Sequence, residues 1–268
     1  MATVSDRHLG THADDQWKAL VDRWIFVFTA ALITTAVLVG FVPDSLMKLG
    51  LLAENKRAPI PAMMHVHAVL MGSWMLLLLT QTTLMATGRK ALHMQLGVIG
   101  MFLAPALVIV GVMLVQVNAR TYLEWVATAP PELQAKADAQ MQRSANIMLI
   151  QFRTGITFLA LVWIALRARR SDSATHKRLL ILATSVPLSA AFNRMTWLPS
   201  NMPDSPLLGE VWHLFLIAPM FSWEWYRHGA LQRAYVIWAA WFVPGVVIIT
   251  LAWNTPGWQS WARGFLYG

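Results

Sequence analysis

Residues 61–86 read PAMMHVHAVLMGSWMLLLLTQTTLMA, an almost unbroken apolar run that His65 and His67 interrupt near its start. A helix that crosses a bilayer needs about 20 mostly apolar residues. The run therefore predicts a transmembrane helix over Ala62–Ala86, preceded by Pro61 where proline favours helix initiation. Imidazole is costly in hydrocarbon, and an ionisable residue inside a membrane marks a candidate functional site. This stretch thus predicts a membrane protein with a polar site inside it.

The composition of the whole chain agrees with this prediction. Hydrophobic residues make up 57% of the 268 residues and charged residues 13%, whereas a soluble domain carries about 25% charged residues. The net charge is +8, but the basic residues lie between apolar runs and not in one patch. This pattern indicates contact with a lipid bilayer and no nucleic acid. The chain has no cysteine, which excludes disulfides, thiolate haem ligation and cysteine-ligated iron–sulfur clusters.

Six more apolar runs extend the prediction to an all-α bundle of seven transmembrane helices. Residues 1–23 form a polar segment without the apolar core of a signal peptide, residues 24–253 form the transmembrane domain, and residues 254–268 form a short outer tail. The predicted spans are Trp24–Val42, Ala62–Ala86, Leu92–Val117, Ala145–Leu166, Leu179–Phe192, Leu207–Tyr226 and Tyr235–Trp253.

Lysine and arginine predict how this bundle is oriented. They concentrate in the loops that follow the second, fourth and sixth predicted spans, and all three loops lie on one side of a seven-span chain. Cytoplasmic loops carry the excess of lysine and arginine, so the N-terminus is predicted to be cytoplasmic and the C-terminus periplasmic. The last span has no lysine for a Schiff base, which excludes a retinal protein.

The predicted topology sorts the histidines into two layers. His67 and His213 both lie about 10 Å below the outer ends of their helices, at 1.5 Å per residue. His93 and His176 each open a helix at the inner side. Polar residues this deep should face the interior of the bundle, and on the sixth span one stripe runs from Glu210 and His213 through Ile217 and Met220 to Glu224. Other polar residues predicted to line the interior are Gln81, Arg153 and Arg194.

Two sequence elements carry a family resemblance. One is Thr175-His176-Lys177-Arg178-Leu179-Leu180-Ile181-Leu182-Ala183 with Arg194 after it, and the other is His67, Gly72, Trp74 and Gln81, followed by Arg89, His93 and Gly97. These elements resemble an uncharacterised family of bacterial multi-pass membrane proteins, which implies a location in the bacterial inner membrane.

That family is similar in outline to cytochrome b561-type proteins, in which histidines on neighbouring helices hold two haems b near opposite faces. Carried over, the resemblance implies an inner pair, His93 with His176, and an outer pair, His67 with His213. The chain departs from the b561 pattern because its fourth predicted span has no histidine, while its sixth supplies one.

The sequence leaves three functions open. The first is electron transfer through haem b, with an unknown electron donor and acceptor. The second is an enzyme with a Zn, Fe or Cu ion in an outer pocket, where Arg153 or Arg194 would hold an anionic substrate. The third is a cofactor-free subunit of a larger respiratory or photosynthetic membrane complex. The ligands predicted for the second are His65, His67, His213 and Glu210.

Overall fold

The computed structural model describes residues 4–267, with side chains from Asp15 onward, and this part of the chain folds into helices without any strand. The helices are α1 (Val4–Ala53), α2 (Ala62–Ala86), α3 (Lys90–Val126), α4 (Pro131–Gln134), α5 (Ala137–Ala168), α6 (Ser173–Ser185), the 3₁₀ turn η1 (Val186–Leu188), α7 (Ser189–Phe192), α8 (Leu207–His228), α9 (Arg233–Ala252) and α10 (Pro256–Tyr267).

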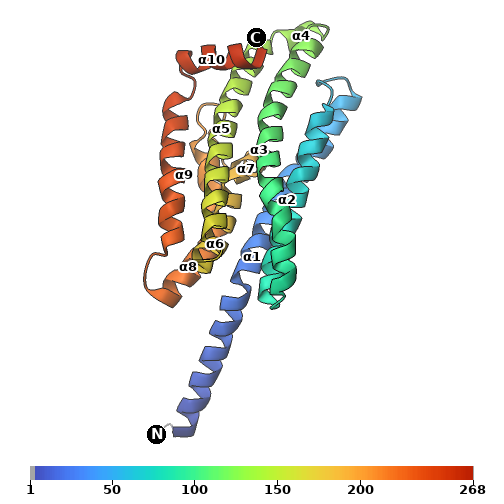
Figure 1. Ribbon diagram of the computed structural model, residues 1–268. Coiled ribbons are helices and arrows are strands. Elements are labelled where there is room, and N and C mark those ends of the chain that lie inside the picture. The colour runs from blue at the N-terminus through green and yellow to red at the C-terminus, as the bar shows by residue number, and fades with distance from the viewer. Residues whose placement is uncertain (1–3, 268) are drawn as a thin grey trace.

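The long helices form one bundle in which successive segments run in opposite directions (Figure 1). The N-terminal part of α1 projects from one end of the bundle, and α10 lies across the other end. The two termini are therefore at opposite ends of the bundle, which is the arrangement of a chain with an odd number of passes.

Five of the described helices are long and apolar enough to cross a membrane. They are α1 from residue 15, α2, α3, α5 and α9. The protein is therefore all-α with the character of a multi-pass membrane protein. The segment α6–η1–α7 and helix α8 pack within the same bundle, but they are less apolar, so a count of seven spans and the sidedness of the termini stay predictions.

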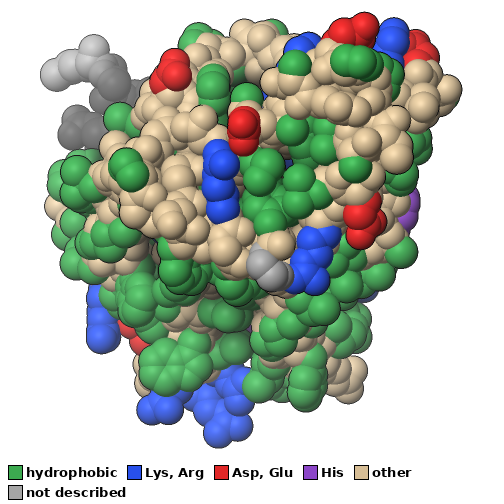
Figure 2. All heavy atoms as spheres, turned by 90° about the horizontal axis from the view of Figure 1, so that it is seen from above, with side chains coloured by type: hydrophobic (Ala, Val, Ile, Leu, Met, Phe, Trp, Pro, Cys, Tyr) green, Lys and Arg blue, Asp and Glu red, His purple; other side chains and the backbone are tan. Residues whose placement is uncertain are grey.

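The outside of the bundle is largely apolar, as a surface in contact with lipid must be. Leu76 on α2, Phe102 and Ile109 on α3 and Leu251 on α9 are each at least 60% exposed. Soluble proteins rarely expose contiguous apolar patches of this kind. Figure 2, which looks at the α10 end, shows lysine and arginine scattered among hydrophobic side chains.

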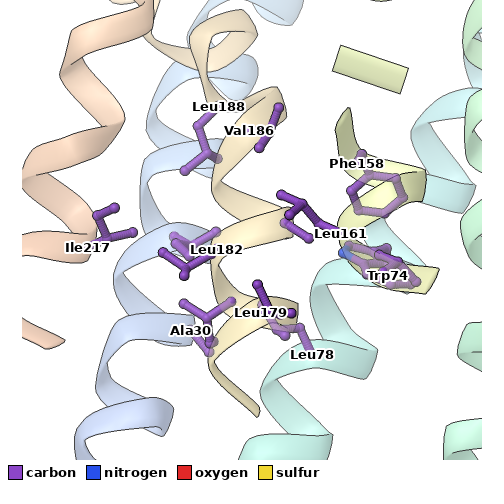
Figure 3. Packing of buried hydrophobic residues seen from close by; sticks show 14 of the residues in the cluster. Ala30, Trp74, Leu78, Phe158, Leu161, Leu179, Leu182, Val186, Leu188 and Ile217 are labelled. Carbon is purple, nitrogen blue, oxygen red and sulfur yellow. The ribbon is translucent and has the colours of Figure 1, made fainter. Parts of the chain in front are cut away.

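The core lies between α1, α2, α3, α5, α6, α8 and α9, and Figure 3 shows part of it. Trp74 packs edge-on against Phe158 at 5.1 Å between ring centroids, and its indole N–H donates to Thr184 Oγ1 at 3.1 Å. Leu161 and Leu182 beside them are fully buried. Trp74 thus connects α2 to α5 and α6.

Three parts of the fold differ from the sequence prediction. Helices α1 and α3 are much longer than the spans inside them, because polar residues continue each helix beyond its apolar part. The predicted fifth span is divided by the 3₁₀ turn at Pro187, where proline cannot supply a helical N–H. The predicted outer tail forms α10, whose Ala262 and Leu266 are buried against the bundle.

Candidate functional site

One face of α8 carries the most polar part of the bundle interior. Glu210, His213, Ile217, Met220 and Glu224 are all buried, and they follow one another at helical spacing. Because all five residues are buried, the stripe that was predicted from the sequence faces the interior of the bundle. Its acidic residues lie near the two ends of the helix, so the interior has two charged layers.

The layer nearer α10 is built around an ion pair between Arg153 on α5 and Glu210. Both side chains are at least 95% buried, and the arginine guanidinium also lies 5.5 Å from the ring centroid of Phe242 on α9. Helix α9 can approach Arg153 because residue 245 is glycine: a Cβ there would lie 3.0 Å from two carbons of the arginine side chain. A buried charge is tolerated only when it is paired, and here α5 and α8 each supply one partner.

His213 lies one helical turn from Glu210 and is completely buried. Its ring meets Phe242 edge-on at 4.8 Å between centroids and Trp238 at 6.2 Å. Neither ring nitrogen has a hydrogen-bond partner among the residues that the structure describes. Buried polar groups are normally hydrogen-bonded, so the imidazole of His213 is an exception in this layer.

The second layer joins α6, α8 and α9 through three polar side chains. Arg178 Nε lies 2.7 Å from Glu224 Oε1, and the Tyr235 hydroxyl donates to Glu224 Oε2 at 2.8 Å. Arg178 also donates to the main-chain carbonyl of Ala174 at 2.8 Å. The carboxylate therefore has a charged partner and a neutral donor, which is what a buried ion pair needs to be stable.

The inner histidines lie at the ends of their helices, as predicted. His176 in the first turn of α6 shares a 2.8 Å hydrogen bond between its Nδ1 and the carbonyl oxygen of Ala165 on α5. His93 in the first turn of α3 has a buried Nδ1 without a partner among the described residues. Both helix starts lie at the end of the bundle opposite α10 (Figure 1). The structure thus places the two inner histidines toward the same end.

Loop and cap residues fix these helix starts. Asp172 caps α6 by accepting a 2.9 Å hydrogen bond from the Thr175 main-chain N–H. Hydrogen bonds from Thr175 hold the pKa of this carboxyl below its usual value. Gln81 on α2 donates to the main-chain carbonyl of His93 at 3.1 Å, so this predicted interior residue attaches α2 to the start of α3.

The predicted outer residues face different helices. His65 is exposed, whereas His67 is half-buried and faces α3, where a Cβ at Gly111 would lie 3.6 Å from its ring. His213 faces α9 instead. Arg194 follows α7 and pairs with Asp44 on α1, with 3.1 Å between Nε and Oδ2.

Within residues 15–267, no group of three or more histidine, cysteine, aspartate or glutamate side chains is arranged to hold a metal ion. The predicted set of His65, His67, Glu210 and His213 is therefore not drawn together in this structure. This finding does not bear on the predicted pairs of histidines, since a haem iron takes at most two ligands from the protein.

Two residues of the charged layers were not predicted from the sequence. Arg178 stands in a basic run that was interpreted as a topology signal, and Tyr235 was interpreted only as the first residue of a span. Nothing local marks either one, because their shared partner Glu224 is on another helix.

Comparison with known proteins adds no relative: no family model, no curated protein and no solved structure matches this chain. The resemblance to cytochrome b561-type proteins therefore stays an expectation from the sequence elements quoted above.

Proposed function

We propose that this is a redox protein of a bacterial inner membrane, in which His93 and His176 hold a haem b near the cytoplasmic side. The observation that carries the proposal is that these two imidazoles, in the first turns of α3 and α6, lie toward the same end of the bundle, where the His176 ring already has a hydrogen bond to Ala165. Both rings are partly buried.

The hydrogen bonding of the His176 ring suits ligation of a metal. A histidine that binds a metal usually gives its other ring N–H to a carbonyl or carboxylate, which fixes the tautomer and the ring orientation. In His176 the Nδ1–Ala165 contact would do this and leave the Nε2 lone pair for iron. His93 has an unpartnered Nδ1 and a helix start held by Gln81. The donor set therefore fits a bis-histidine haem, which supplies one-electron transfer.

Three residues near His93 and His176 would influence how these histidines bind haem. Asp172 and Gln81 fix the helix starts, so they would determine the orientation of the two imidazoles. Arg178, two residues after His176, is already paired with Glu224. It would therefore contribute little uncompensated positive charge near the iron.

The outer pair receives less support, and the proposal does not include it. His213 is enclosed by Trp238 and Phe242, whose stacked rings lie 4.8 Å apart between centroids. His67 faces Gly111 on α3. A second haem would require both rings to leave these contacts.

The test is the visible spectrum of the protein purified in mild detergent, first oxidised and then reduced with dithionite. A Soret band, with α and β bands that sharpen on reduction, is the expected result. His93→Ala and His176→Ala should each abolish or shift these bands, while the exposed His65→Ala should leave them unchanged. A protein without visible absorption, or a spectrum that neither inner variant alters, would overturn the proposal and favour a cofactor-free subunit.

A further inference from the structure

A half-buried cluster of cations surrounds Asp44 near the end of the bundle where α10 lies. Lys48 lies one turn after Asp44 on α1 and pairs with its Oδ2. Arg194, which follows α7, pairs with the same oxygen. Arg57, in the loop between α1 and α2, interacts electrostatically with both Asp44 and Lys48. We call Asp44, Lys48, Arg57 and Arg194 the basic cluster.

The charges in the basic cluster do not balance. Lys48 and Arg194 share one carboxylate, and Arg57 in the adjoining loop has no acidic partner of its own, which leaves an excess of two positive charges among the described side chains. Arg143 on α5 adds a further positive charge that acts on Arg194. The nearby Glu54 does not offset the excess, because it is exposed and pairs with Lys56 at 2.6 Å. Partial burial makes uncompensated charge unfavourable, so the cluster calls for an anion.

The hydrogen-bond donors in the cluster also exceed the acceptors. Arg194 donates to Asp44 and to the main-chain carbonyl of Ala190, yet a guanidinium carries five N–H groups. Arg57 donates from Nε to its neighbour Ala58, and its Nη1 is buried without a partner among the described residues. Burial lowers the pKa of Arg57. The planar guanidinium group of arginine can donate two parallel hydrogen bonds to the oxygens of a phosphate or carboxylate group.

We propose that the basic cluster binds an anionic group, a phosphate or a carboxylate, at this end of the bundle. The group could belong to a soluble anion or to the head of an anionic lipid, since both present the same oxygens. The site lies near the start of α2, because Arg57 is in the loop that joins α1 to α2. This proposal does not depend on haem, and its test uses no haem signal.

The first experiment measures the thermal unfolding of the purified protein in a neutral detergent, with inorganic phosphate replacing chloride at constant ionic strength. The wild-type protein should gain stability as phosphate rises, with saturation, because a ligand that binds only the folded state raises its stability. Lys48→Gln and Arg57→Gln should each weaken the apparent affinity roughly ten-fold or more, the loss of one charge-assisted hydrogen bond. The matched control is Lys56→Gln, a neighbouring exposed lysine whose removal should leave the phosphate effect intact.

The second experiment identifies the source of the anion by native mass spectrometry with added phosphatidylglycerol or phosphatidylcholine. Retention of phosphatidylglycerol alone, reduced by Lys48→Gln and Arg57→Gln but not by Lys56→Gln, would assign the site to a lipid head group even if phosphate has no effect. A phosphate response without selective lipid retention would assign it to a soluble anion. If neither probe responds, or if Lys56→Gln weakens binding as much as the other two variants, the proposal is wrong.

Discussion

The ion pair between Arg178 and Glu224 offers the sharpest test of the charged layers. We consider Glu224→Gln, Arg178→Met and the double variant, each made in the full chain. Both side chains are about 95% buried, so neither single variant leaves its partner a route to water. The remaining arginine or carboxylate is then an uncompensated buried charge.

The expected magnitudes follow from this burial. Removing one partner of a buried ion pair costs about 3–5 kcal/mol, whereas replacing both by apolar side chains is close to neutral. Glu224→Gln retains a carbonyl oxygen that can still accept from Arg178 and from Tyr235, so its loss should fall at the lower end, about 3 kcal/mol. Arg178→Met should cost about 3–5 kcal/mol. The double variant should be more stable than the sum of the two losses predicts.

The assay is reversible unfolding in a mild detergent with increasing sodium dodecyl sulfate, followed by tryptophan fluorescence. The coupling energy is the difference between the double variant and the sum of the single variants. The control is the exposed pair of Asp22 and Arg227, 2.9 Å apart between oxygen and nitrogen, for which we expect a much smaller coupling. Additive losses at the buried pair, or single losses no larger than those of the exposed pair, would refute this account of the inner layer.

Two further predictions concern the backbone. Gly40→Ala should destabilise the protein by about 1–3 kcal/mol, because the new Cβ would lie 2.5 Å from the carbonyl oxygen of Ala191. The control Gly72→Ala, whose new Cβ has nothing within 4 Å, should be neutral or stabilising. Equal melting temperatures for the two variants would contradict this prediction. Asn254 has a φ of 59° and accepts a 2.6 Å hydrogen bond from Asn146. Both Asn254→Ala and Asn254→Gly remove the hydrogen bond, but only glycine adopts a positive φ without strain, so Asn254→Ala should lower the melting temperature more. The reverse order would show that the left-handed backbone is not the cause.

Much of the fold could be predicted from the sequence, because the length of an apolar run depends only on consecutive residues. The bounds of α2 were predicted correctly at both ends, and the start of α8 was predicted correctly at Leu207. The inward stripe on α8 was also correct, because charged residues at helical spacing have only one favourable direction in a bilayer. These predictions needed no knowledge of any neighbouring helix.

The predictions that were wrong concern helices whose polar ends continue beyond the apolar part, and segments in which a local sequence signal was not used. Hydropathy finds only the apolar part of α1 and α3, so their polar ends were assigned to loops. Pro187 could have predicted the break in the fifth segment. In α10 the aromatic residues Trp258, Trp261 and Phe265 recur every three or four positions, which is a helical pattern. Only a short outer tail was nevertheless predicted for this segment.

The partners of the site residues could not be predicted, since pairing is not local. Glu210 and Glu224 were identified as interior residues, but Arg153 and Arg178 meet them only because α5, α6 and α8 pack together. Arg194 was placed at the outer pocket as a substrate ligand, whereas in the structure Asp44 already pairs with it. A charge in one sequence has many candidate partners, and only the fold selects among them.

The paired charges also explain why α8 is not among the helices that are apolar enough to cross a membrane on their own. Glu210 and Glu224 are 14 residues apart, or about 21 Å along the helix axis, so a crossing α8 would place both inside a hydrocarbon core of about 30 Å. Arg153 on α5 and Arg178 on α6 neutralise them. We therefore expect α8 to cross the bilayer only once the preceding helices are in place.

This expectation can be tested by labelling single cysteines, because the natural chain has none. Ser200→Cys, before α8, and Ala230→Cys, after it, should react from opposite sides of the membrane. In intact cells an impermeant maleimide should label the first but reach the second only after permeabilisation. In a background of Arg153→Met with Arg178→Met, the two glutamates lose their partners, and a fraction of the chains should leave both positions on one side. Labelling of both cysteines from the same side in the otherwise natural chain would show that α8 does not cross, and the two charged layers would then lie at a single membrane surface.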